Sequence, residues 1–280
     1  MRMLEIRWSW FTVVKYAVYL LLLSNLVQFF FEDLGSLRQM NAAALSLADY
    51  VSIFAVTLDT AAWFVMLLLF ELETAVIADE YFTRRAERLL HVTRFICAGA
   101  IVYAFYGYLT KALGFGDFVP LDVAGACALP PGYEAIVDLD DYEPLNARNC
   151  ASFVGPLLTL PGSTLFATVQ DHLFATRLAW LDVINAGAWI IILMMLEVDV
   201  RVTEHHRRLA TWQPLSRASK GVLYTVLFVA AILWGLAGAA LDFVDASLWL
   251  FAFFCIELNV FAWAREVAPR AGITSGASAG

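Results

Sequence analysis

Acidic side chains recur at one fixed spacing in three strongly apolar stretches of the chain. The pattern is (D/N)-x3-W-x7-E-x-(D/E/N), and all its positions are filled three times. Its members are Asp59, Trp63, Glu71 and Glu73; Asn185, Trp189, Glu197 and Asp199; and Asp245, Trp249, Glu257 and Asn259. A charge at the centre of a bilayer costs about 2.5–3.5 kcal/mol, so intramembrane acids are paired with a base or take part in function. The chemistry they could supply is ion pairing, cation binding or proton relay.

The basic residues nearest to these acids open the three preceding apolar stretches: Lys15, Arg94 and Lys220. Two interpretations fit this arrangement. In the first, each acid pairs with a base of its own or the next helical hairpin, which closes a ring of ion pairs around tryptophan packing anchors. In the second, Glu71, Glu197 and Glu257 line a path for cations or protons. Asp59, Asn185 and Asp245 then form a second polar layer about 18 Å away along the helices.

The segments that carry these residues are predicted to be transmembrane helices. The chain has 280 residues, of which 61% are hydrophobic and only 16% charged, whereas soluble domains average about 25% charged residues. About 20 apolar residues span a hydrocarbon core. Six stretches satisfy this length: 9–31, 50–73, 92–113, 178–200, 221–241 and 247–266. We therefore expect an all-α, multi-pass membrane protein.

Pairing of consecutive spans predicts three tandem hairpins related by a pseudo-threefold axis. The hairpins cover residues 9–78, then 92–113 with 178–204, then 219–266, all within one membrane domain, 1–270. A long loop, 114–177, is inserted in the second hairpin as a cap, and 271–280 are expected to form a flexible cytoplasmic tail. Within the loop, the apolar spacing in 165–174 predicts an amphipathic helix on the membrane surface.

The basic residues also predict the orientation of the chain. Of the 18 Lys and Arg residues, 14 flank the spans on the side of both termini, and cytoplasmic flanks carry such an excess. This predicts a bacterial-type inner membrane protein with cytoplasmic termini and an extracytoplasmic 114–177 loop. The first apolar run is longer than the 7–15 residues typical of a signal peptide, which predicts a retained span.

The long loop contains Cys127 and Cys150, the two cysteines outside the predicted spans. Because disulfides persist in extracytoplasmic compartments, we expect these two residues to form one. Cys97 and Cys255 fall within spans, where cysteine usually behaves as a small apolar residue.

Two functional hypotheses follow from the repeated acids. The first is that the protein moves or senses cations or protons through them. The alternative is a non-catalytic accessory or scaffold subunit of a membrane complex, in which the acids form structural ion pairs with Lys15, Arg94 and Lys220. An enzyme is less favoured, because none of the four histidines lies in the apolar centre of a span and no nucleophile or phosphate-binding motif is recognisable. We expect no metal, no cofactor and no nucleic acid; the expected partners are the lipid bilayer and a second copy or another membrane subunit.

Overall fold

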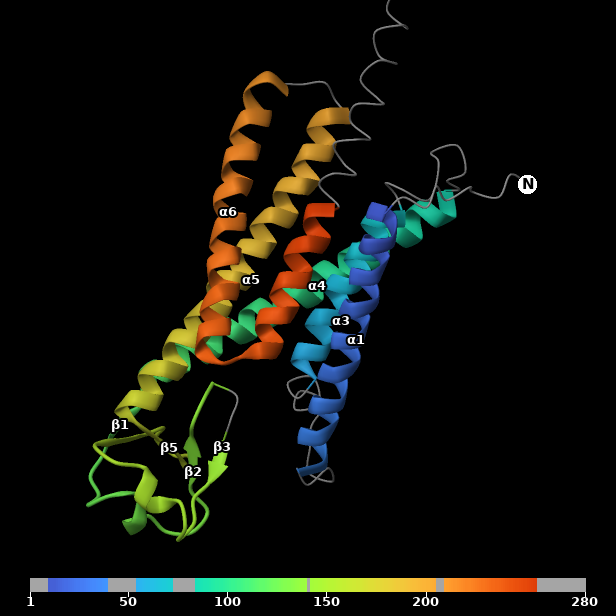
Figure 1. Ribbon diagram of the computed structural model, residues 1–280. Coiled ribbons are helices and arrows are strands. Elements are labelled where there is room, and N and C mark those ends of the chain that lie inside the picture. Colours follow the sequence, from blue (N-terminus) through green and yellow to red (C-terminus); the bar gives the residue numbers. More distant parts are fainter. Residues whose placement is uncertain (1–9, 40–53, 73–83, 140–141, 205–208, 256–280) are drawn as a thin grey trace, which may run out of the picture. The chain divides into compact units, whose positions relative to one another are not determined.

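A computed structural model of the chain describes residues 10–39, 54–72, 84–139, 142–204 and 209–255. Most of these residues are helical (Figure 1). The helices are α1 (Trp10–Gln39), α3 (Ala55–Glu71), α4 (Arg84–Gly114), α5 (Val169–Glu204) and α6 (Leu209–Ala237), and residues 240–255 are also helical. The chain divides into two compact units, one formed by 1–104 with 190–280 and the other by Phe105–Trp189.

Four helices in the described ranges are long and apolar enough to cross a membrane. They contain Thr12–Phe31, Arg88–Asp117, Val169–Asp199 and Pro214–Ala237. The described parts of α3 and of 240–255 are apolar but shorter than the roughly 20 residues that a span needs. The chain is thus a helical protein with the spans of a multi-pass membrane protein, while six spans and the threefold repeat remain predictions.

Four helices extend beyond the predicted span limits. α1 continues to Gln39, α4 begins at Arg84, α5 begins at Val169 and α6 begins at Leu209. Hydropathy locates the edge of the apolar run, but a helix ends only where its backbone hydrogen bonds stop, so polar residues can continue it. Helix α6 ends at Gly238, which has a φ of 92°. The bond from the Ala239 N–H to the Trp234 carbonyl oxygen (3.1 Å) closes the end of the helix.

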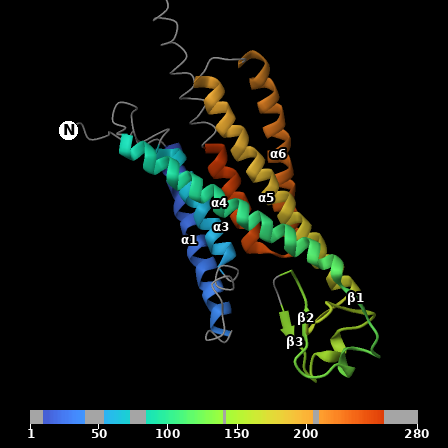
Figure 2. The same cartoon turned by 180° about the vertical axis from the view of Figure 1, so that it is seen from behind.

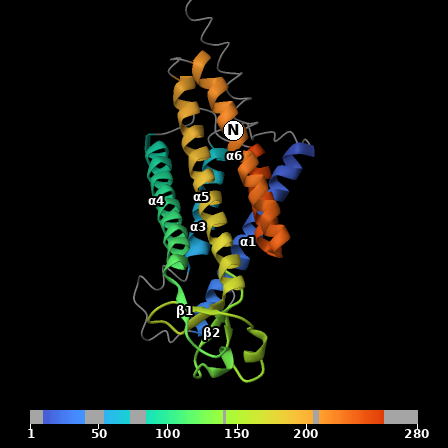
Figure 3. The ribbon, with the colours of Figure 1, turned by 90° about the vertical axis from the view of Figure 1, so that its left-hand side faces the viewer.

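In the first unit, α1 and α3 lie side by side (Figure 2), and α6 runs beside the C-terminal part of α5 (Figure 3). Asp33 of α1 joins the first pair at the start of α3. Its carboxylate accepts hydrogen bonds from the Thr57 backbone N–H (3.2 Å) and hydroxyl (2.5 Å). An acid therefore caps an N–H group that the first turn of a helix leaves without an internal partner.

The second unit contains a small sheet, so the expectation of an all-α chain is wrong for the cap. The sheet has the strand order β1-β4-β5-β2-β3. The strands are β1 (Val119–Leu121), β2 (Glu134–Ile136), β3 (Tyr142–Pro144), β4 (Leu157–Thr159) and β5 (Leu165–Thr168). Pairing is antiparallel except between β2 and β5, where Glu134 lies opposite Leu165. Phe166 and Ala135, both fully buried, lie in the core of this cap with Leu157 and Ala126.

The predicted amphipathic helix over 165–174 is also wrong in its first half. Leu165–Thr168 is strand β5, and Val169 begins α5 itself. A side-chain cap marks the change: the Asp171 N–H donates to the Thr168 hydroxyl oxygen (3.2 Å), and that hydroxyl donates to the Asp171 carboxylate (2.6 Å). The predicted disulfide between Cys127 and Cys150 is confirmed and joins the short 3-10 helices Ala126–Ala128 and Cys150–Ser152.

Candidate functional site

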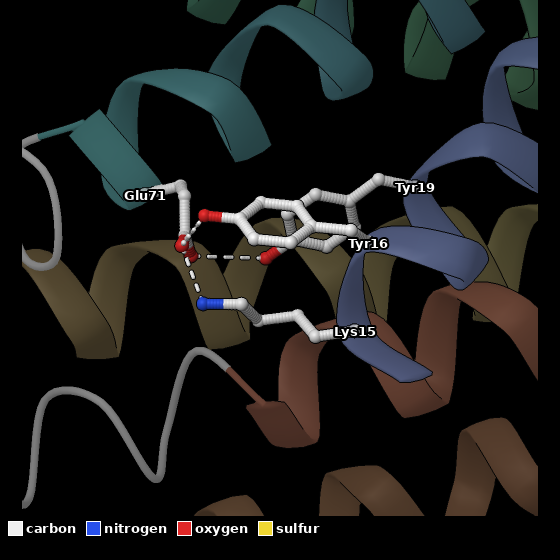
Figure 4. A network of polar contacts seen from close by, with 4 residues as sticks. All are labelled: Lys15, Tyr16, Tyr19 and Glu71. Carbon is white, nitrogen blue, oxygen red and sulfur yellow. Dashed lines mark hydrogen bonds and ion pairs between the residues drawn. The ribbon is translucent and has the colours of Figure 1, made fainter. Parts of the chain in front are cut away.

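Two of the three buried charged side chains described in the first unit meet at Glu71, the last residue of α3 (Figure 4). The Lys15 ammonium of α1 forms an ion pair with Glu71 Oε1, and the two side chains are only 7% and 5% exposed. The Tyr16 and Tyr19 hydroxyls donate to Oε1 (3.4 Å) and Oε2 (3.2 Å). Both oxygens of this carboxylate are therefore engaged by donors from one face of α1.

A second carboxylate with several donors lies between α5 and α6. Asp199 Oδ1 accepts from the Trp212 indole N–H (2.7 Å), while Oδ2 accepts from the Ser216 hydroxyl (2.9 Å) and the Lys220 ammonium (3.0 Å). The three donors stand four residues apart, so they share one face of α6. Trp212 and Ser216 are not members of the repeated pattern, but their W-x3-S-x3-K spacing with Lys220 is a signal that could have identified them.

The third contact, between Arg94 of α4 and Glu197 of α5, is weaker. The guanidinium and carboxylate are 4.0 Å apart, and their side chains are 18% and 35% exposed. The guanidinium also lies 5.2 Å from the centre of the Phe70 ring of α3, within the range of a cation–π interaction. Arg94 thus contacts two neighbouring helices within the first unit.

Together the three contacts differ from a simple ring of equivalent pairs. Lys15 and Arg94 each meet the glutamate of their own predicted hairpin, but Lys220 meets Asp199 of the second. Glu197 and Asp199 are two residues apart and point about 160° away from each other around α5. One helix can therefore pair with α4 on one side and with α6 on the other. Glu73 and Glu257 lie outside the described residues.

The residues of the second predicted layer are only partly brought together. Asp245, on the helix 240–255, accepts a hydrogen bond from the Asn25 side-chain amide of α1 (2.9 Å), and Trp249 is its second side-chain partner. A tryptophan four residues after an acid can thus donate back to it along one helix face. Asp59 is half-buried on α3. Asn185 belongs to the other unit of the chain.

Two of the repeated tryptophans pack against the same ring. Phe253 lies 5.9 Å from Trp63 of α3 and 6.2 Å from Trp249, measured between ring centres. Trp189 is buried on the part of α5 that belongs to the second unit. The Trp63 and Phe253 rings meet edge to face, and the Trp249 and Phe253 rings are tilted by 47°. Such contacts suit the interpretation of Trp63 and Trp249 as packing anchors, because aromatic rings attract one another at these separations.

Within the described residues, no group of three or more His, Cys, Asp or Glu side chains is placed to hold a metal ion. The fold and contacts of the described residues define a mostly helical protein with four helices apolar enough to cross a membrane, charged side chains paired between helices, and a disulfide-bonded cap. Comparison of the chain with protein-family models, with curated proteins and with solved structures gave no match.

Proposed function

We propose that the protein is a non-catalytic accessory or scaffold subunit in the membrane, whose intramembrane charges fix the packing of its helices. One observation carries this proposal: Glu71, Glu197 and Asp199 each face a base from another helix, namely Lys15, Arg94 and Lys220. A helix shifted by one turn would leave a charge in hydrocarbon without its counter-charge, which costs several kcal/mol. The pairs therefore favour one helix register over the alternatives.

The donors around the acids favour this role over cation binding. A carboxylate that binds a passing cation needs oxygens that can exchange ligands. Both oxygens of Glu71 already accept hydrogen bonds, as do both oxygens of Asp199. Buried ion pairs add little net stability, but loss of one partner is strongly unfavourable. This behaviour is expected of ion pairs that fix how helices pack.

A second candidate, proton movement, is favoured by the Glu71 cluster alone. The Lys15 ammonium and the Tyr16 and Tyr19 hydroxyls all carry exchangeable protons and all contact one buried carboxylate. A proton passing between such groups needs only short transfers. This candidate requires the Lys15–Glu71 pair to break and reform during each cycle.

The topology belongs to the same proposal. We place the termini in the cytoplasm of a bacterial-type cell and the 114–177 cap outside its inner membrane. The basic flanks and the cap disulfide support this orientation, because thiols on the cytoplasmic side are kept reduced. Reporter fusions after residue 132 and at the C-terminus test it: we expect an extracytoplasmic signal from the first and a cytoplasmic signal from the second. The reverse pattern would overturn the orientation.

Exchange of the charges at positions 15 and 71 distinguishes the scaffold from the proton path. Lys15→Glu places two acids together and should prevent accumulation of folded protein, whereas Lys15→Glu with Glu71→Lys restores one base and one acid at the same contact. For a scaffold, the double variant should recover folding. Wild type in liposomes under a pH gradient should leak no faster than protein-free vesicles.

Proton flux through wild type that Glu71→Gln abolishes would overturn the scaffold proposal and favour the proton path. The matched control is Glu134→Gln, which removes an exposed acid from strand β2 of the cap. If Glu134→Gln lowers the flux equally, the loss reflects surface charge and the path through Glu71 is excluded. Failure of the charge exchange to restore folding would contradict the role of the pair in packing.

A further inference from the structure

An open groove lies in the second unit, where the first two turns of α5 face the loops of the cap. Its volume is about 770 Å³, within the roughly 300–1,000 Å³ range of small-molecule sites. Val137 and Val154 line it from the cap, and Val169, Leu173 and Phe174 line it from α5. Four of these side chains, all but Phe174, are substantially exposed. The groove is therefore an apolar surface that an additional molecule could cover.

Two opposite charges also line the groove, Asp171 in the first turn of α5 and Arg177 six residues further along the helix. Asp171 is held in place by the Thr168 hydroxyl, which donates to its Oδ2 atom (2.6 Å). Arg177 makes no ion pair within the part of the chain that the structure describes. Long helical side chains point toward the N-terminus of their helix, which for Arg177 is the direction of Asp171 along the axis.

The position of Arg177 along α5 corresponds to the surface of a bilayer. The apolar stretch Val169–Asp199 has 31 residues, but about 20 residues suffice to cross the hydrocarbon core. Twenty residues beyond Arg177 is Glu197, at the other end of the span. Trp180, three residues from Arg177 and 41% exposed, suits the aromatic belt of the headgroup region. A span that ends at Glu197 would put Arg177 at the level of lipid phosphates, with Asp171 and the cap residues of the groove beyond it.

We propose that this groove binds the headgroup of a zwitterionic phospholipid that carries a primary amine, as in phosphatidylethanolamine. The guanidinium of Arg177 binds the phosphate, and the ammonium group reaches the Asp171 carboxylate. The headgroup methylenes lie against Leu173 and the two cap valines. The two charges are about 9 Å apart along the helix axis, a gap that the Arg177 side chain shortens. This site is independent of the ion pairs between the helices.

The test uses the full chain, purified in detergent and incubated with defined lipids, with bound lipid counted by native mass spectrometry. Wild type should retain phosphatidylethanolamine about fivefold better than phosphatidylglycerol, which has the phosphate but no amine; this is the upper value for a solvent-accessible ion pair. Arg177→Gln should lower retention of both lipids. Asp171→Asn, which can still accept the Thr168 hydrogen bond, should lower retention of phosphatidylethanolamine to the level of phosphatidylglycerol.

Arg148→Gln is the matched control, because it removes an exposed base from the cap outside the groove. It should retain phosphatidylethanolamine as wild type does. Equal losses from Arg148→Gln and Arg177→Gln would overturn the proposal in favour of general charge attraction. Equal retention of the two lipids by wild type would overturn recognition of the amine. Lipid retention that no groove substitution changes would also overturn the proposal and leave a peptide or protein segment as the occupant.

Discussion

Removal of Lys15 tests the stability of the buried pair most directly. Lys15→Met keeps a side chain of similar length but leaves the Glu71 carboxylate without its base. The two side chains are only 7% and 5% exposed, so water cannot replace the lost partner. Loss of one member of a buried pair costs about 3–5 kcal/mol, which is a large part of the 5–15 kcal/mol that holds a typical domain folded. We expect a fall of that size in the free energy of unfolding.

A triple variant shows whether this cost comes from the charge left behind. Lys15→Met with Glu71→Met removes both charges, and Tyr19→Phe removes a buried hydroxyl that would otherwise lose its acceptor. Replacement of a buried pair by well-packed apolar groups is often neutral or stabilising, so the triple variant should recover most of the loss.

The assay is reversible unfolding in mixed micelles of rising denaturing-detergent fraction, followed by far-UV circular dichroism. Arg94→Gln is the comparison, because its pair with Glu197 is longer, 4.0 Å, and more exposed. It should cost less than about 1 kcal/mol. A Lys15→Met effect no larger than that of Arg94→Gln would refute the reasoning, as would a triple variant as unstable as the single one.

Three further substitutions test other parts of the structure. Cys127→Ser opens the disulfide with Cys150, whose partners are 23 residues apart, and should destabilise the cap by about 3 kcal/mol; limited proteolysis should cut the cap of this variant faster, and an unchanged rate would contradict the expectation. Thr168→Ala should cost about 1 kcal/mol through loss of the α5 cap, whereas Thr168→Ser should cost much less; equal thermal shifts would argue against capping. Asp199→Asn keeps an acceptor but removes the counter-charge of Lys220, and should lower the free energy of unfolding by about 1–3 kcal/mol in the same mixed-micelle assay. A stability equal to that of wild type would exclude a structural role for this charge.

The helices and the disulfide were predictable from the sequence because their signals are local or compositional. An apolar run of about 20 residues has few alternatives to a helix in a membrane, since every backbone group must be bonded within the segment. Cys127 and Cys150 are the two cysteines outside such runs, so the choice of partner was narrow. Helix ends were less predictable. α5, for example, begins at Val169 with Thr168 as its cap, nine residues before the apolar limit used for the prediction.

The sheet of the cap could not be predicted in the same way. Four of its strands have three residues and the fifth has four, which is too short for an alternating pattern to stand out. The parallel pair brings Glu134 opposite Leu165, two residues far apart in the sequence, and local propensity carries no information about such a pairing. Around Leu165–Thr168, apolar residues recur every three to four positions, which fits a helix. The segment forms a strand because it pairs with both β2 and β4.

The contacts of Asp199 show why equivalent positions in a repeat need not have equivalent partners. The spacing of the repeat places Glu71 and Glu197 in the same register, and each meets the base of its own hairpin. Lys220 occupies the corresponding position in the third hairpin, yet it pairs with Asp199, the second acid of the doublet. Two acids at i and i+2 face opposite sides of a helix, so a helix that carries both can contact two neighbours at once. α5 can thus pair with bases on two sides, whereas a single repeated glutamate could pair on only one.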